Sequence, residues 1–346
     1  MQKIKTALLS YGMSGKIFHA PFLELHPGFE ITGAWERSKK LVQEDFPLVK
    51  SYATFDELLK DDVDLVIVNT PVETHFEYAK KALLAGKHVL VEKAFTTTVA
   101  EAEELREIAE DKKRKLSVFQ NRRFDSDFKT VKDIFDKDIL GEIIEAEIHF
   151  DRYNPELSAK KHKESPTAGA GILKDLGPHI IDQALVLFGF PECIFADIRI
   201  TRKHSVVDDW FDILLYYPAF RVRLKASFFI REPLPSYILH GTKGSFLKSR
   251  GDIQEDELKL GKSPMVTNWG IEPIYKSGVL HTEIEGSTVR ENIPTLHGNY
   301  YGFFDQLYKS IRRNEPEPVT ATDGVNVMRI IEAAIQSSAE KKIIKF

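Results

Sequence analysis

The chain has 346 residues, more than one hydrophobic core usually supports, so we expect two domains. Its formal net charge is −4, with acidic and basic residues intermixed, which gives no reason to expect nucleic acid or a membrane surface as a partner. A single cysteine excludes an intramolecular disulfide. The segment MQKIKTALLSYG lacks the apolar core and cleavage site typical of a signal peptide, and no run of about 18 apolar residues occurs. We expect a cytoplasmic protein whose ligand is a small polar molecule.

Short apolar runs alternate with amphipathic stretches over the first 120 residues. The runs read IKTALLS, FEITGAW, VDLVIV, KHVLV and KLSVF, spaced about 20 to 30 residues apart. Between the last two, EAEELREIAEDKK places Ala102, Leu105, Ile108 and Ala109 on one helical face. This alternation predicts an α/β fold, a doubly wound parallel sheet of the Rossmann type over residues 1–122, with its ligand site at the carboxyl ends of the strands.

The first predicted strand runs into the segment SYGMSGKIF. Ser10, Gly12 and Gly15 occupy the three positions of the dinucleotide fingerprint, with serine in place of the first glycine. Gly12 would let the backbone approach a pyrophosphate, and the amides of the next helix, which opens at Met13 and Ser14, would hold its charge. The alternative is an ordinary tight turn.

The second predicted strand ends at Glu36, about twenty residues after the glycines. An acid at this point commonly binds the adenosine ribose hydroxyls, whereas Arg37 and Ser38 could instead receive a 2′-phosphate. A solvated charge cluster would explain the same residues. The sequence therefore predicts either NAD or NADP as cofactor.

Polar residues also follow the next two strands at the same predicted edge of the sheet. We assign them to the cofactor site: Asn69, Thr70, Pro71, His75, Glu92 and Lys93. A helix start explains His75 equally well, and a chain returning to water explains Lys93.

The segment ILKDLGPHIID places two acids and a histidine among apolar residues. Pro178 suits the first turn of a helix, so His179 would lie in that turn and Asp182 on the same face. Asp175 is expected just upstream in extended chain. The three groups could converge on one small volume, or the acids could simply favour the helix dipole.

After Phe124, strands with period-two patterning replace the earlier rhythm. In RVRLKASFFI, apolar residues alternate with charged ones, and EIIEAEIHF, CIFADIRIT, WFDILLYY, SYILHG and GSFLKS add further strands. We expect an α+β domain over residues 123–346 with an open, mainly antiparallel sheet covered by helices on one side. Its aromatic residues fit either a subunit interface or an ordinary sheet: Trp210, Tyr216, Tyr217 and Phe229.

NTPVETHFEYAKKALLAGKHVLVEKAF, together with DLGPHIID, resembles the Gfo/Idh/MocA family of nicotinamide-dependent oxidoreductases. The resemblance runs nearly end to end, through HGTKGSF to a closing helix in VNVMRIIEAAIQSSAEKKII that could pack back on the first domain. VFQNRRFDSDF is similar to the branch that contains scyllo-inositol dehydrogenases. Two residues depart from the family pattern: Ser10, and Ala94 where the family has proline after the lysine.

The resemblance implies a catalytic set of Lys93, Asp175 and His179 and a sugar or inositol substrate. His179 would accept the alcohol proton, Lys93 would stabilise the developing alkoxide, and Asp175 would orient one of them. We expect Asp182 to position the helix rather than to act as a catalyst. The residues assigned to substrate binding are Arg123, Arg152, Tyr153, Asp175 and His179.

The resemblance also implies a homodimer or homotetramer paired through the open sheet, and it favours NADP slightly over NAD. Two other classes of function stay open: a cofactor-bound redox sensor without turnover, and a hydrolase or epimerase that uses transient oxidation. No metal is expected, because the eleven histidines are scattered without ligand spacing.

Overall fold

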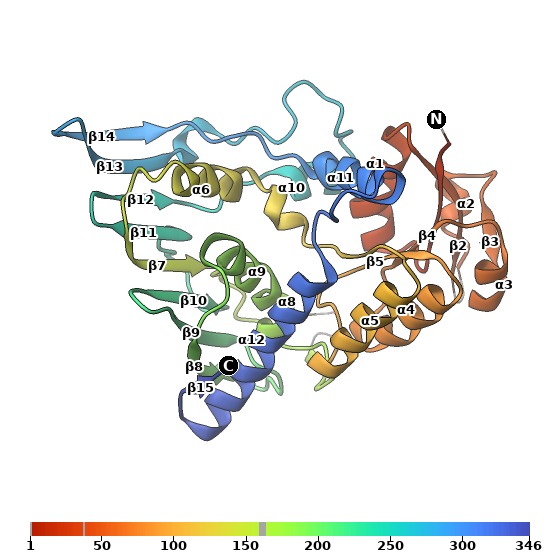
Figure 1. Ribbon diagram of the computed structural model, residues 1–346, viewed down its shortest axis with the longest axis horizontal. Coiled ribbons are helices and arrows are strands. Elements are labelled where there is room, and N and C mark those ends of the chain that lie inside the picture. The colour runs from red at the N-terminus through yellow and green to blue at the C-terminus, as the bar shows by residue number, and fades with distance from the viewer. Residues whose placement is uncertain (1, 37–38, 159–163) are drawn as a thin grey trace. The chain divides into compact units, whose positions relative to one another are not determined.

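The computed structural model describes residues 2–36, 39–158 and 164–346. The chain forms two compact units (Figure 1). The first comprises Met1–Asn121, Gln254–Trp269 and Asn299–Val325, and the second comprises Arg122–Ile253, Gly270–Gly298 and Asn326–Phe346. Each unit therefore draws on three separate stretches of the chain.

The first unit is built on a six-stranded parallel sheet in the order β3-β2-β1-β4-β5-β6. Its strands are β1 Ile4–Leu8, β2 Phe29–Trp35, β3 Lys50–Tyr52, β4 Leu65–Val68, β5 His88–Val91 and β6 Leu116–Val118. This order confirms the predicted doubly wound Rossmann sheet, whose ligand crevice lies beyond the carboxyl ends of the strands. The sequence missed β3, because its three residues carry no apolar run.

The helices of this unit are short apart from α4, α5 and α11. They are α1 Ala20–Leu25, α2 Val42–Asp45, α3 Phe55–Lys60, α4 His75–Leu84, α5 Val99–Asp111, α10 Gln254–Lys259 and α11 Tyr300–Arg313, with a π-helical turn at Ser14–His19 and a 3-10 turn at Val72–Thr74. Helix α5 begins with a capping box, in which Thr98 and Glu101 each bind the other's backbone N–H. The predicted apolar face of α5 is buried at Ala102, Leu105 and Ala109.

The second unit is built on a nine-stranded sheet in the order β14-β13-β12-β11-β7-β10-β9-β8-β15. The strands are β7 Ile143–His149, β8 Cys193–Arg199, β9 Trp210–Tyr216, β10 Arg221–Ser227, β11 Tyr237–Gly241, β12 Gly244–Lys248, β13 Gly278–Ile284, β14 Ser287–Ile293 and β15 Ile344–Lys345. Only β7 and β10 pair in parallel, which confirms the mainly antiparallel sheet. The hairpin β13–β14 was missed because β14 is largely exposed and polar.

Helices cover one face of this sheet. They are α6 Ser126–Asp136, α8 Ile172–Asp175 and α9 Gly177–Phe188, and α6 and α9 lie on the same face of the strands (Figure 1). The 3-10 turns Asn121–Phe124 and Ile274–Lys276 connect elements, and helix α12, Ala321–Glu340, belongs to the first unit up to Val325 and to the second from Asn326. Along β10, Val222, Leu224 and Ala226 are fully buried and alternate with charged residues, as the sequence predicted.

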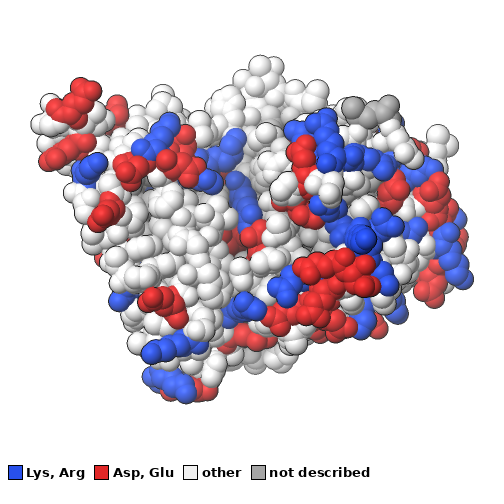
Figure 2. Space-filling model, viewed as in Figure 1, with Lys and Arg blue, Asp and Glu red and all other residues white. Residues whose placement is uncertain are grey.

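The surface carries both signs of charge. In the view of Figure 2, basic and acidic side chains are intermixed, and acidic side chains gather over α5. Among the described helices, none combines the length and the apolar character needed to cross a membrane. Of the aromatic residues expected on the open sheet, Phe229 is exposed, whereas Tyr217 is buried and stacks on Phe220 with ring centroids 4.6 Å apart.

Candidate active site

The loop between β1 and the Ser14–His19 turn is closed by its own serine. The Ser10 hydroxyl accepts a hydrogen bond from the Gly12 N–H at 3.2 Å, so the side chain completes the turn where the fingerprint has glycine. The Ser10 carbonyl accepts the Asn69 side-chain amide at 2.8 Å. The serine therefore keeps the loop tight instead of loosening it.

The two remaining glycines of the loop have different surroundings. A Cβ added to Gly15 would lie 2.4 Å from the Ser10 carbonyl oxygen, so close packing within the protein requires glycine there. A Cβ added to Gly12 would meet only the Ser10 hydroxyl, at 3.5 Å. The space beside Gly12 is therefore open, as the close approach of a dinucleotide pyrophosphate to this loop requires.

Glu92, at the end of β5, is bound by the helical turn that follows the glycines. It accepts hydrogen bonds from the Ser14 hydroxyl and from His19 Nε2, the latter at 2.9 Å. Burial alone would raise the pKa of Glu92, but the bonds from His19 and Ser14 and the charge of Lys93 lower it below its ordinary value. Glu92 is thus an ionised group that ties the end of β5 to the glycine loop.

His19 is a residue of this site that the sequence analysis missed. Its side chain is completely buried, and its ring packs against Phe119 with centroids 4.4 Å apart. Its position four residues after Gly15, on the first helical turns after the glycines, was the available signal.

The polar residues after β4 are turned mainly toward the protein itself. The His75 ring lies between two backbone carbonyls, with Nε2 2.8 Å from Thr70 O and Nδ1 2.9 Å from Ala94 O. Burial lowers the pKa of His75 below its ordinary value, and hydrogen bonding to the two carbonyls partly opposes this shift. His75 therefore fastens the segment after Lys93 to the end of β4, and it also begins α4.

Asn69 leaves one acceptor for a ligand. Its Oδ1 atom is buried and has no hydrogen-bond partner within the part of the chain that the structure describes. Thr70 and Thr74 share a hydrogen bond of 2.7 Å between their hydroxyls, and Pro71 precedes the 3-10 turn. A buried amide oxygen without a partner is costly, which favours a bound donor at this position.

Glu36, at the end of β2, binds the start of a helix. Its two carboxylate oxygens accept the backbone N–H groups of Leu41 and Val42, at 3.2 and 3.0 Å. The sequence did not anticipate this capping of α2. Arg37 and Ser38, which we assigned to a 2′-phosphate, lie outside the described residues.

In the second unit, α8 and α9 present the candidate catalytic pair. Pro178 lies in the first turn of α9, as predicted, and His179 next to it is buried. Asp175 was expected in extended chain; it is instead the last residue of the short helix α8, and its N–H donates to the Gly171 carbonyl at 3.0 Å. Asp175 and His179 are thus carried by two consecutive helices.

Asp182 is committed to another partner. Both of its carboxylate oxygens accept hydrogen bonds from Arg123, which was assigned to the substrate. The guanidinium of Arg123 is held through this pair, and a positioning role for Asp182 stays a prediction.

Arg152 and Tyr153 follow the end of β7. The Arg152 N–H donates to the Ser227 carbonyl at 2.8 Å, and its guanidinium lies 5.0 Å from the centre of the Phe150 ring. The Tyr153 ring is 42% exposed and lies 4.0 Å from the guanidinium carbon of Arg231. Arg152 is half-buried and Tyr153 is exposed.

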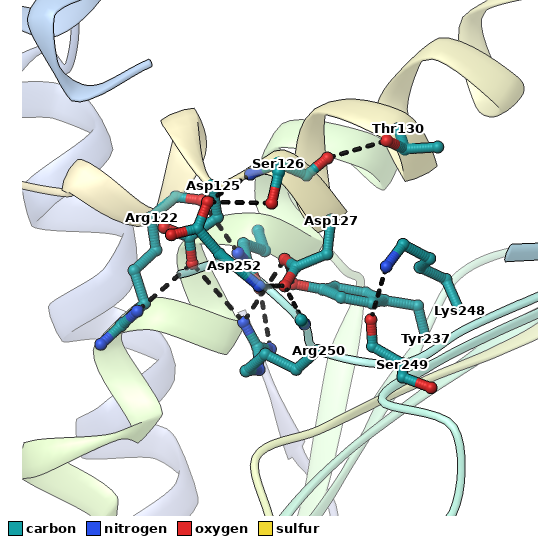
Figure 3. Close-up of polar contacts among 12 residues, drawn as sticks. Arg122, Asp125, Ser126, Asp127, Thr130, Tyr237, Lys248, Ser249, Arg250 and Asp252 are labelled. Carbon is teal, nitrogen blue, oxygen red and sulfur yellow. Dashed lines mark hydrogen bonds and ion pairs between the residues drawn. The ribbon is translucent and has the colours of Figure 1, made fainter. Parts of the chain in front are cut away.

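A buried charged network supports this end of the sheet (Figure 3). Asp127 accepts the N–H groups of Gly251 and Asp252 at 2.8 and 3.1 Å, and Asp252 caps α6 by accepting the Ser126 N–H at 2.8 Å. The Arg250 guanidinium lies near Asp127 and 4.2 Å from the centre of the Phe150 ring. The network holds the start of α6, next to Arg123, in one arrangement.

Comparison with known proteins identifies two matching family regions. Residues 4–120 match the NAD-binding Rossmann fold of the GFO/IDH/MocA oxidoreductase family, and residues 132–346 match its C-terminal alpha/beta domain. The chain is 38% identical to scyllo-inositol 2-dehydrogenase (NADP(+)) IolW of Bacillus subtilis, over 99% of this chain and 95% of that protein. It is 37% identical to the uncharacterized oxidoreductase YdgJ of Escherichia coli, over 98% and 97%.

Solved structures agree over the whole chain. A Bacteroides fragilis protein superimposes with a TM-score of 0.91 at 44% identity, covering all of both chains. YvaA of Bacillus subtilis gives a TM-score of 0.96 at 36% identity and covers 100% of this chain and 99% of its own. With a Rossmann sheet, a glycine loop open at Gly12 and full-length relatives of this kind, the chain belongs to the GFO/IDH/MocA family of oxidoreductases and carries that family's NAD-binding domain.

Proposed function

We propose that this oxidoreductase is an NAD(P)-dependent dehydrogenase that moves a hydride between the nicotinamide and a carbinol of a sugar or inositol. The observation that carries the proposal is the full-length similarity to a scyllo-inositol 2-dehydrogenase, at 38% identity over 99% of the chain. The buried His179 at the start of α9 supplies a group suited to the accompanying proton transfer.

The residues around the glycine loop fit a dinucleotide. The open space at Gly12 and the backbone amides that begin at Met13 and Ser14 can receive the pyrophosphate. Asn69 Oδ1, which has no partner among the described residues, can accept a hydrogen bond from a hydroxyl or an amide of the same ligand. We assign residues 1–122 to cofactor binding and residues 123–346 to the substrate and to subunit pairing. When bound, the dinucleotide supplies the hydride acceptor.

In the direction of alcohol oxidation, the carbinol loses a hydride and its hydroxyl loses a proton. We assign that proton to the His179 imidazole, since a neutral imidazole, with an ordinary pKa of about 6.5, is the side chain best matched to such a transfer near pH 7. Lys93 donates a hydrogen bond to the substrate oxygen and stabilises its developing charge. Asp175 orients one of these two groups, and Arg152 and Tyr153 bind other hydroxyls of the substrate.

We further propose that the protein is a cytoplasmic homodimer or homotetramer that pairs through the open face of its nine-stranded sheet. This face combines the exposed Phe229 with arginines stacked on aromatic rings, such as Arg199 on Trp210 at 4.7 Å and Arg221 on Tyr216 at 4.5 Å. Aromatic residues and arginine are both enriched at protein interfaces.

The test is a screen of inositols, aldoses and the corresponding ketones and lactones with NAD(H) and with NADP(H), followed by the absorbance of the reduced nicotinamide. Turnover with at least one polyol is expected. Bound cofactor that keeps its oxidation state with every polyol would favour a redox sensor, and a product formed without net cofactor consumption would identify a hydrolase or epimerase.

A further inference from the structure

The short helix α8, which carries Asp175, is capped by a residue far away in the sequence. Its own N-cap residue is Gly171, which has no side chain to offer. The Ile172 N–H donates to the Asp208 carbonyl at 2.8 Å, and the Leu173 N–H donates to Asp208 Oδ2 at 2.7 Å. Two of the backbone donors that every helix start leaves unsatisfied are thus bound by one residue, 35 positions downstream.

Gly171 is shaped to receive this carboxylate. Its φ is +92°, a backbone conformation that favours glycine, and a Cβ added there would lie 2.0 Å from Asp208 Oδ1. The carboxylate therefore packs directly against the bare backbone at the point where α8 begins. Neither residue can be exchanged for a larger one without separating the loop from the helix.

Asp208 itself is held by the sheet. It immediately precedes Asp209, which is completely buried and accepts the backbone N–H groups of Thr201 and Arg202, each at 2.8 Å. The Asp209 N–H donates to the Arg199 carbonyl at the end of β8, and β9 begins one residue later. The cap of α8 is therefore anchored to two strands.

Hydrogen bonds continue from the cap to the candidate catalytic pair. After Asp175, the Leu176 N–H donates to the Ile172 carbonyl at 2.9 Å, and the His179 N–H donates to the Leu176 carbonyl at 3.2 Å. A four-residue helix has too few internal hydrogen bonds to hold its own position. The place of Asp175 and of the start of α9 therefore depends on what binds the first amides of α8.

Keeping an acid at this position has a cost. Burial raises the pKa of Asp208, and the hydrogen bond from the Leu173 N–H only partly opposes that rise. The carboxylate binds the Leu173 N–H, whereas the Ile172 N–H is bound by the backbone carbonyl of Asp208, so the side chain accounts for one of the two capping hydrogen bonds.

From this geometry we infer that Asp208 is a positioning residue for Asp175 and His179, acting through the first turn of α8. The inference rests on the proposed function, because it concerns the residues to which catalysis is assigned. Gly171 belongs to the same contact, because its lack of a side chain leaves the space that the Asp208 carboxylate occupies.

The test compares three variants, Asp208→Ala, Asp208→Asn and Gly171→Ala, with one control. The control is Asn299→Ala: the Asn299 side chain caps α11 by accepting the Gly302 N–H at 3.1 Å, and the substitution removes this cap. Asp208→Ala should bind the dinucleotide normally and lose roughly 10- to 100-fold in kcat, the range expected when a catalytic group is displaced by about 1 Å. Asp208→Asn keeps an acceptor for the Leu173 N–H and should recover most of the activity. Gly171→Ala should resemble Asp208→Ala, and the control should lower Tm while leaving kcat unchanged.

Two measurements need no substrate. In Asp208→Ala, hydrogen exchange of the amides of residues 172–176 should accelerate at least tenfold, on the order of the loss of one hydrogen bond, while exchange in β9 stays the same. The His179 imidazole resonances should also move. If the wild-type protein oxidises no polyol, the proposed function fails, whereas the inference is still decided by exchange and by these resonances. The inference would be overturned if Asp208→Ala showed the same exchange rates and His179 resonances as the wild-type protein. It would also be overturned if the variant lost activity only in proportion to its unfolded fraction.

Discussion

Arg123 donates two parallel hydrogen bonds to Asp182, from Nε to Oδ2 at 2.7 Å and from Nη2 to Oδ1 at 2.6 Å. The Asp182 side chain is 2% exposed and that of Arg123 is 16% exposed, so the pair is largely shielded from water. A fork of this kind is among the stronger polar contacts in proteins, and it depends on the planar guanidinium. It joins the start of the second unit to α9, three residues after His179.

The Arg123–Asp182 pair should be expensive to break from one side. Asp182→Ala leaves a buried cation, so we expect the free energy of unfolding to fall by about 3–5 kcal/mol. The double variant Arg123→Met/Asp182→Leu should recover part of this loss, because neither charge is then unpaired. Urea denaturation of the single and double variants measures both values, and simple additivity of the two single losses would contradict the coupling.

The catalytic assignment predicts a specific pattern of losses. His179→Ala should lower kcat by roughly 10²–10⁴-fold, as expected for removal of a general base, while the variant still binds the dinucleotide. Lys93→Ala should lose a similar amount. If His179 serves only the helix start, its removal should cost on the order of 1 kcal/mol of stability and leave the turnover of folded protein intact. Turnover, a thermal melt and a cofactor titration should be measured on the same preparations.

One result would remove His179 from its role. The result would be a His179→Ala variant that melts normally, binds cofactor normally and keeps more than about a tenth of wild-type turnover. Such a loss is too small for the removal of a general base. The proton would then leave through Lys93 or water.

Glu36 bears on cofactor preference. Since both of its carboxylate oxygens already accept backbone N–H groups from the start of α2, its hold on the ribose hydroxyls of NAD is weakened, and we expect NADP(+) to bind more tightly. Glu36→Gln should increase that preference by removing a negative charge near the 2′ position. Fluorescence titration gives both Kd values; equal affinities or a preference for NAD(+) would defeat the expectation.

The oligomeric state is predicted from the open face of the second sheet. Light scattering at micromolar concentration should show a dimer or tetramer, and Phe229→Asp should shift it toward monomer by placing a charge in the interface. Arg313→Asp, at an exposed position of α11 in the first unit, serves as a charge-change control away from this sheet. A monomeric wild-type protein would exclude pairing through this face.

Acid should destabilise the protein partly through His88. Burial, together with the charge of Arg114, lowers the pKa of His88 to about 4, and its Nδ1 accepts the Lys115 N–H at 2.9 Å. The unfolded chain takes up a proton near pH 6.5, whereas the folded chain does so only near pH 4, so stability is lost as the pH falls through this window. His88→Asn should reduce the loss between pH 7.5 and pH 5 by about 2 kcal/mol. Identical pH profiles of unfolding would exclude this role.

Local sequence pattern was sufficient for most of the fold. Every strand that we predicted from an apolar run or from period-two alternation is present, because burial of one or both faces of a strand leaves that pattern in the sequence. Four strands were missed. β3 and β15 have three and two residues, β14 is an exposed edge strand held by its backbone pairing with β13, and β13 is half-exposed with three polar residues among its seven.

The site was less predictable because its geometry depends on distant partners. Asp175 lies in α8, whose first turn is capped by Asp208, and Asp182 is bound by Arg123, 59 residues earlier in the chain. Glu36 turns to the amides of α2, and Glu92 is bound by His19. A single sequence identifies which residues carry polar groups, but it contains no pattern that pairs them across such distances.

The edge strand β6 depends on chain that is made much later. The Ser117 hydroxyl donates to the Val319 carbonyl at 2.7 Å, across 202 positions, and the Val118 N–H donates to the same carbonyl at 3.3 Å. At the usual speed of synthesis, of about 5–20 residues per second, roughly 10 to 40 s separate the two segments as they leave the ribosome. During that interval the nascent Rossmann sheet has an open edge, which is a site for pairing with other chains. Expression of a fragment that stops before residue 319 should therefore yield aggregates.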